Sequence, residues 1–159
     1  MLLRKDNHFF YLIGAIDTRG VFWLYEAKRK DSLSRSTGMR YVSYFSFTTY
    51  RKETCLEFQR AFGGNIVSLN KTKKNNRQAY WTWRVMGRGL ESFCKTVYPH
   101  LLILKRECEL IMKFRNTYPT VTSTSPVNPD IISERHEIVK KFREIVPKFI
   151  DPVNNQEEI

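Results

Sequence analysis

Two strand-rich stretches, each preceded by a short helix-like segment, limit the folds that are open to this chain. Residues 21–30 and 40–50 are rich in β-branched and aromatic side chains, and the polar sequence DSLSRSTGM between them predicts the loop of a long hairpin. A second hairpin is predicted from strands at about 65–70 and 79–86, joined by the polar turn KTKKNNRQ. Because hairpins join antiparallel neighbours, the four strands predict one antiparallel sheet.

Helices are predicted before, between and after the hairpins. Residues 7–18 carry apolar side chains at helical spacing, and Gly20 fits the end of that helix. A second amphipathic helix at residues 51–62 is ended by the sequence GGN. Further helices are expected at about 88–97, 103–117 and 131–146. The expected fold class is therefore α+β, with a four-stranded antiparallel sheet backed by helices.

The polar sequence TYPTVTSTSPVNP has the composition of a linker. We therefore divide the chain into a main domain at 1–117, a linker at 118–130, and a C-terminal helix with a polar tail at 131–159. No run of about 18 uncharged apolar residues is present, so neither a transmembrane helix nor a membrane partner is expected. The charged N-terminal sequence MLLRKDNHFF is unlike a signal peptide.

The three cysteines, Cys55, Cys94 and Cys108, are odd in number and lack the spacing of metal ligands. This pattern predicts reduced, mostly buried thiols in an intracellular protein. The expected compartment is the cytoplasm, or an organelle matrix if the protein is organelle-encoded.

The positive charge of the chain is concentrated in one segment. The formal net charge is +11, and residues 19–90 hold 15 Lys or Arg against 4 Asp or Glu, whereas the remainder holds 12 of each. The whole excess therefore lies in the segment that contains the predicted sheet. A segregated positive surface favours a polyanionic partner, most often nucleic acid.

Alternation along the strands separates the two faces of the predicted sheet. The inner face, toward the helices, receives Phe22, Leu24, Tyr41, Phe45, Phe47, Trp81, Trp83 and Val85. The outer face is polar, basic and aromatic, and is nearly free of acids. The predicted DNA-binding residues there are Trp23, Tyr25, Arg29, Arg35, Arg40, Tyr44, Ser46, Thr48, Tyr80, Thr82 and Arg84, with Lys71, Lys73, Lys74 and Arg77 at the end of the sheet.

A solvated sheet face is also polar, so charge and polarity alone do not identify a binding surface. The aromatic side chains among the cations favour a sheet that lies in the major groove of duplex DNA and reads base edges. Single-stranded RNA remains a competing partner, because aromatic side chains also stack on unpaired bases.

At residues 12–20 the sequence LIGAIDTRG resembles the motif of the LAGLIDADG homing endonucleases. The pieces that follow, FGGNI, YWTWRVMG and YPHLLILKRECEL, are similar to that family in type and order. The resemblance covers about residues 8–117. It implies the αββαββα fold, with a saddle-shaped sheet over the major groove of double-stranded DNA, and this agrees with the fold predicted from the pattern alone.

The chain carries one copy of the motif, and the resemblance implies a homodimer on a long, near-palindromic site. In the family, two motif helices pack together at the dyad, so Ile13, Gly14 and Asp17 are expected at the interface. Small side chains such as Gly14 and Ala15 let helix backbones approach closely; the alternative is that they fill a tight core. The bulky Ile13 stands where the family usually has alanine.

The sequence departs from the family at the catalytic acid. The metal-binding carboxylate of the family occupies the eighth motif position, which is Arg19 in this chain. A guanidinium has no lone pair to offer Mg²⁺ and keeps its positive charge. We therefore expect Arg19 to contact the central DNA phosphates. No metal-ligand set is predicted; no cofactor is expected if the nuclease is inactive, and Mg²⁺ is expected if it is active.

Two residues match other catalytic positions of the family. Asp17 matches the sixth position of the motif, which is also acidic in the family, and Lys105 matches, within one residue, a lysine that opens a later helix. Asp17 and Arg19 are about 200° apart around a helix, so their side chains are expected to point in roughly opposite directions. An acid at a helix C-terminus also opposes the macrodipole, so a structural partner is expected for Asp17.

Three functions therefore remain open from the sequence. The first is a sequence-specific DNA-binding protein whose nuclease activity is lost or impaired. The second is an active endonuclease that holds a divalent metal ion with other groups. The third is an intron RNA maturase, for which nuclease residues are dispensable.

Overall fold

A computed structural model describes residues 7–28, 39–69, 80–118 and 128–146 of the 159-residue chain. The elements follow one another as α1 (Asn7–Arg19), β1 (Val21–Lys28), β2 (Met39–Thr49), α2 (Lys52–Phe62), β3 (Asn65–Leu69), β4 (Tyr80–Met86), α3 (Gly87–Val97), a short 3-10 helix η1 (Tyr98–His100), α4 (Lys105–Asn116) and α5 (Pro129–Ile145). Each predicted helix and strand is present, so the α+β class is confirmed. Most of the predicted linker lies outside the described residues.

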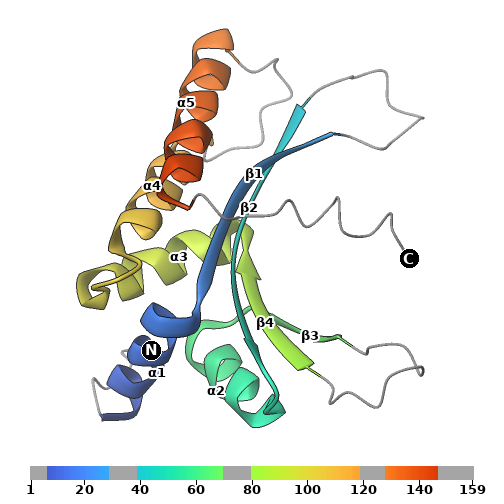
Figure 1. The fold of residues 1–159 in the computed structure, drawn as a ribbon, viewed down its shortest axis with the longest axis vertical. Helices are drawn as coiled ribbons and strands as arrows, with labels where there is room; N and C mark the ends of the chain where they lie inside the picture. Colours follow the sequence, from blue (N-terminus) through green and yellow to red (C-terminus); the bar gives the residue numbers. More distant parts are fainter. Residues whose placement is uncertain (1–6, 29–38, 70–79, 119–127, 147–159) are drawn as a thin grey trace.

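The four strands form one antiparallel sheet in the order β1-β2-β4-β3. Trp23 of β1 pairs with Tyr44 of β2, and Arg84 of β4 pairs with Ser46 of β2 and with Asn65 of β3. Strands β2 and β4 are therefore the central pair. The sheet is curved, and the described helices lie on one side of it, so no described helix covers the other face, which we call the open face (Figure 1).

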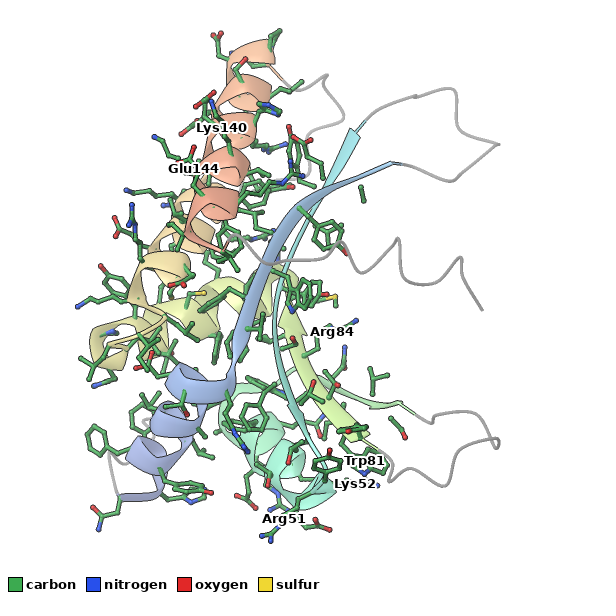
Figure 2. The ribbon with its side chains drawn as sticks, in the orientation of Figure 1. Arg51, Lys52, Trp81, Arg84, Lys140 and Glu144 are labelled. Atoms are coloured by element: carbon green, nitrogen blue, oxygen red, sulfur yellow. The ribbon has the colours of Figure 1, made fainter. Side chains whose placement is uncertain are left out.

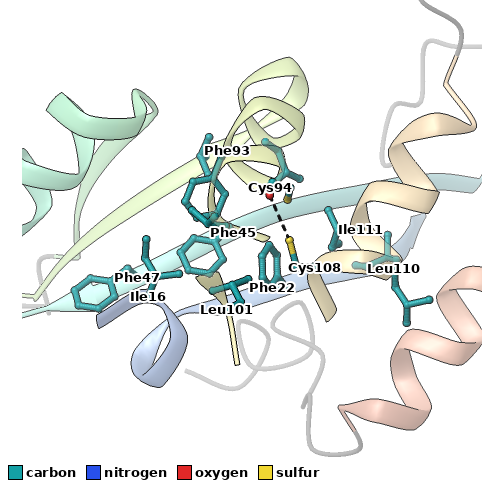
Figure 3. Packing of buried hydrophobic residues seen from close by; sticks show 14 of the residues in the cluster. Ile16, Phe22, Phe45, Phe47, Phe93, Cys94, Leu101, Cys108, Leu110 and Ile111 are labelled. Carbon is teal, nitrogen blue, oxygen red and sulfur yellow. Dashed lines mark hydrogen bonds between the residues drawn. The ribbon is translucent and has the colours of Figure 1, made fainter. Parts of the chain in front are cut away.

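The hydrophobic core lies between the sheet and the helices (Figure 3). Its largest fully buried side chain is Trp83, which packs on Phe58 of α2 and Phe93 of α3 at ring-centroid distances of 5.1 and 5.5 Å. The Trp83 Nε1–H donates to the carbonyl oxygen of Gly63 at 2.7 Å. The inner-face assignment is confirmed for the residues that reach this core: Phe22, Leu24, Phe45, Phe47, Trp83 and Val85.

Two glycines make the tight connections that this fold requires. A Cβ on Gly20 would lie 2.1 Å from the Phe45 ring and 2.5 Å from the Ile16 carbonyl oxygen, so α1 can end here and enter β1 only without a side chain. Gly63 has φ of 72°, and its N–H donates to the carbonyl oxygen of Gln59 at 2.8 Å, which closes α2.

The last helix, α5, packs on α4 and β1. Its Arg135 is 6% exposed and donates to both the hydroxyl and the carbonyl oxygen of Thr117, at 2.9 Å each. The Nδ1 atom of its His136 lies 2.7 Å from Oε1 of Glu26, which is on β1. Residues Ile138, Val139 and Phe142 of α5 belong to the same core as the sheet.

The predicted burial of the cysteines is confirmed, because Cys55, Cys94 and Cys108 are all free and buried. The compartment of the protein stays a prediction. Among the described residues, no helix has the length and apolar character needed to cross a membrane.

Candidate nucleic-acid interface

The open face of the sheet carries the side chains that alternation assigned to it. Trp23 Nε1 donates to Ser46 Oγ at 2.8 Å, the hydroxyls of Thr48 and Thr82 lie 2.9 Å apart, and Tyr80 shares a 2.6 Å hydrogen bond with Tyr50. These contacts join neighbouring strands across one surface, so the outer-face assignment is confirmed for them. Whether these residues contact DNA stays a prediction.

Several predicted DNA-binding residues cannot be placed. Arg29, Arg35, Lys71, Lys73, Lys74 and Arg77 lie outside the described residues, and for Arg40 only the backbone position in β2 is described.

Tyr44 lies at the centre of an aromatic and cationic stack on the open face. Its ring stacks on Trp23 with a centroid distance of 5.6 Å and an interplanar angle of 19°, and Tyr25 meets it edge-on. The Arg84 guanidinium lies 4.6 Å from the ring centroid. Tyr44 is only 8% exposed, and this burial, with Tyr25 nearby, raises the pKa of its hydroxyl although Arg84 opposes the shift. Tyr44 therefore supports its neighbours and offers little surface of its own.

A cleft of about 660 Å³ lies beside α1, where β2 passes into α2. It is lined by Phe10, Tyr11, Gly14, Ala15, Thr18, Arg19, Phe47, Thr49, Tyr50, Arg51 and Thr54. Two arginines and five hydroxyl-bearing side chains are among these residues, and none of them is an acid. The cleft therefore suits an anion such as a phosphate, and it does not offer the carboxylate oxygens that Mg²⁺ prefers.

Arg51 and Tyr50 line this cleft but were not predicted from the sequence. Arg51 comes directly before α2, and its N–H donates to Thr49 Oγ1 at 3.2 Å. Lys52 lies next to it, with its ammonium 4.8 Å from the centroid of the Trp81 ring (Figure 2). From the sequence, Arg51 and Lys52 are predicted only to begin a helix. The positive charge that Arg51 adds to the cleft is therefore not predicted.

Asp17 has the structural partner that the sequence predicts for it. Its carboxylate accepts the backbone N–H groups of Leu102, Ile103 and Leu104 at 2.8 to 3.0 Å. These groups lie in the segment just before α4, so the carboxylate ties the end of α1 to the approach to that helix. A catalytic role for Asp17 stays a prediction. Asp17 is 7% exposed and points away from the cleft that Arg19 lines, as the helical rotation predicted.

The other predicted catalytic residue, Lys105, does not line the cleft either. It opens α4, is exposed, and holds its ammonium 5.3 Å from the centroid of the Tyr98 ring. In the described part of the chain, no group of three or more His, Cys, Asp or Glu side chains could hold a metal ion.

The three residues predicted at the dimer interface do not all lie on the exposed side of α1. Ile13 is 4% exposed and lies in the core, and Asp17 is buried against α4, so helix rotation turns both side chains away from solvent. Gly14 is exposed, and a Cβ there would meet no atom within 4 Å. Phe10 and Tyr11 are exposed to 50% and 68% nearby. Of the three predicted interface residues, only Gly14 is therefore available to a partner.

No protein-family model and no curated protein sequence matches the chain. Solved structures do match. The homing endonuclease I-CvuI in complex with DNA gives a TM-score of 0.67 at 17% identity, over 87% of this chain and 81% of that one. The archaeal intron-encoded homing endonuclease I-Vdi141I in complex with DNA gives a TM-score of 0.64 at 16% identity, over 85% of this chain and 81% of that one. The LAGLIDADG homing endonuclease I-GzeII with DNA gives 0.59 at 18%, over 89% of this chain and 49% of that one. The chain therefore has the LAGLIDADG homing endonuclease fold.

The hydrogen bonds of Asp17 lead to a prediction about stability. Asp17→Ala removes the acceptor of three backbone N–H groups, and we expect it to lower the free energy of unfolding by about 2–4 kcal/mol. Thr18→Ala is the matched control, because the exposed Thr18 hydroxyl bonds only carbonyl oxygens of its own helix. Urea denaturation of both variants measures the difference. If the Asp17→Ala protein is as stable as the control, the hydrogen bonds to the Asp17 carboxylate do not contribute substantially to the free energy of unfolding.

Proposed function

We propose that this protein is a sequence-specific binder of double-stranded DNA, a member of the LAGLIDADG homing endonuclease family that acts as a homodimer and has lost or nearly lost nuclease activity. The observation that carries the proposal is the acid-free cleft, which Arg19 lines. The sequence resemblance implies that Arg19 stands at the position of the family's catalytic acid. The proposed binding surface is the open face of the sheet, continued by the cleft.

Duplex DNA is the favoured partner because of the shape and chemistry of the open face. A curved antiparallel sheet can enter the major groove, where each base pair presents a distinct set of donors and acceptors. The described cations of this surface include Arg84 on the open face and Arg51 in the cleft, which form no ion pair with the described carboxylates. They are therefore available to phosphates and base edges.

The proposal of a homodimer is based on the exposed Gly14 of α1. A glycine in the interior of an exposed helix costs about 1 kcal/mol relative to alanine. No described neighbour fills the space that a Cβ would occupy, so nothing in the described part of the subunit compensates this cost. A second α1 helix packed against Gly14 would compensate it and would cover the exposed Phe10 and Tyr11 rings. The same packing would place two Arg19 side chains near the dyad.

Loss of cleavage follows from the groups that the cleft offers. Hydrolysis by this family's chemistry needs a divalent metal ion held by carboxylates beside the scissile phosphate. Arg19 cannot ligate a cation, and Asp17, two residues before it in the sequence, is engaged with the backbone N–H groups just before α4. The residues present do not fit the metal, so we assign no metal-dependent step. Arg19 takes the place of the cation and contacts the phosphates directly.

Salt dependence tests the proposed partner. If each subunit neutralises about 4–6 phosphates, the slope of log K against log salt for duplex binding should be roughly −7 to −11. Selection from a random duplex library followed by titration at several salt concentrations gives this slope. A slope shallower than about −3, or tighter binding to intron RNA than to selected duplexes, would contradict the proposal.

Arg19→Ala should bind more weakly and lower the magnitude of the salt slope by about 2, one phosphate contact in each subunit. Wild-type protein should bind its selected site equally well with and without Mg²⁺ and should leave it uncut. Arg143→Ala, an exposed change in the last turn of α5, is the charge-matched control. Efficient double-strand cleavage by the wild type in Mg²⁺ would overturn the loss of activity.

Gly14→Leu should leave the subunit folded and abolish the dimer, because the added side chain has free space within the subunit but none against a second helix. Light scattering of the complex with a selected full-length site measures the stoichiometry. Thr96→Leu, an exposed position on α3, is the matched control. A Gly14→Leu protein that remains dimeric on DNA would show that α1 is not the interface.

A further inference from the structure

We propose that Arg84 reads a guanine in the major groove, once in each half-site, and that Tyr44 holds its guanidinium ready for that contact. This inference rests on the proposed function and adds to it a particular base and the residue that reads it. It is carried by the stack of Trp23, Tyr44 and Arg84 on the open face.

The base of this stack is fixed by contacts within the sheet. The indole of Trp23 donates to Ser46 Oγ at 2.8 Å, and its ring lies against Tyr44 at an interplanar angle of 19°. Ser46 and Tyr44 are each 8% exposed, although they lie on the face that has no helix over it. Residues that are buried on an open face are covered by their neighbours, so the stack is a packed and ordered platform.

Arg84 contacts Tyr44 from the strand on the other side of β2: Trp23 lies on β1, Arg84 lies on β4, and both strands are neighbours of β2. Its guanidinium lies 4.6 Å from the centroid of the Tyr44 ring. Its Nε is buried without a hydrogen-bond partner among the described residues, and no described carboxylate pairs with it. The side chain as a whole is partly exposed, on the side of the sheet away from the helices (Figure 2). The two Nη groups are therefore the donors left for a ligand.

The position of Arg84 favours a base over a phosphate. Arg84 lies on β4, one of the two central strands, and pairs with Ser46 and Asn65. When a sheet lies in the major groove, its centre faces the base edges and its margins face the two sugar–phosphate backbones. Arg51 and Lys52, at the end of β2, are placed for the backbone instead.

The chemistry of the guanidinium selects the base. Arginine is purely a donor, and its planar fork matches two acceptors side by side. Among the four bases, only guanine presents two acceptors, N7 and O6, on its major-groove edge. Stacking on Tyr44 fixes the plane of the fork before binding, so less side-chain freedom is lost when the contact forms. A lysine at this place would lack the planar fork and would carry its donors on a flexible stem, so its contact with guanine would be less well fixed in direction.

The experiment compares base preference at every position of the selected site. The full-length wild type and the variants Arg84→Ala, Arg84→Lys, Tyr44→Phe and Tyr44→Leu are each titrated against the selected duplex and against all its single-base-pair changes. Tyr44→Phe is the matched control, because it keeps the aromatic platform and removes only the hydroxyl. Thermal unfolding confirms that each variant is folded.

We expect the wild type to prefer guanine by about 5- to 150-fold at one symmetry-related position in each half-site. Arg84→Ala and Arg84→Lys should lose this preference and keep those at other positions. Tyr44→Leu should reduce it, and Tyr44→Phe should retain it.

Uniform weakening of all duplexes by Arg84→Ala would show a phosphate contact and overturn the inference, while duplex binding by the wild type would still support the proposed function. An unchanged base preference in both Arg84 variants would also overturn it. If the wild type selects no duplex at all, the proposed function fails together with this inference.

Discussion

The carboxylate of Asp17 joins the end of α1 to the start of α4, and the geometry of the cleft depends on this bond. Three backbone N–H groups from residues far along the chain converge on one side chain. The contact fixes the rotation of α1 about its axis, because Asp17 must face α4. The same rotation turns Ile13 into the core, leaves Gly14 exposed, and directs Arg19 into the cleft. One buried acid therefore determines which side of α1 is presented to partners.

The open face of the sheet is organised by a second set of contacts, between side chains of neighbouring strands. An exposed sheet face normally leaves long side chains with many conformations, and ordering them on binding costs free energy. Here the Thr48–Thr82 hydrogen bond and the stack around Tyr44 already restrict several of them. Such a surface loses less conformational freedom when it meets a rigid partner, which suits recognition of a duplex groove.

The element order, the sheet and its two faces could be predicted because alternation and helical spacing report burial directly. Local patterns say less about long-range contacts. The sequence indicated that Asp17 needed a partner, but nothing near it identified three N–H groups more than eighty residues away. Arg51 and Tyr50 were missed for the same reason: they become part of a cleft only when α1 packs beside the end of β2. The burial of Tyr44 could not be predicted from its own strand, because it depends on contacts with Trp23 of β1 and Arg84 of β4.

Arg19 has a physical advantage at its position that an acid would lack. It ends α1, where the unpaired carbonyl groups carry partial negative charge, and a cation there stabilises the helix whereas a carboxylate opposes it. A metal-binding acid at a helix C-terminus is therefore costly until a cation arrives. Replacing it with arginine removes that cost and the metal site together. The cleft then holds the positive charges of Arg19 and Arg51 without a described carboxylate between them, and these charges repel each other until an anion enters. In the function proposed above, a DNA phosphate supplies that anion, so the same arginine that cannot hold a metal ion also strengthens the attraction of the cleft for the DNA backbone.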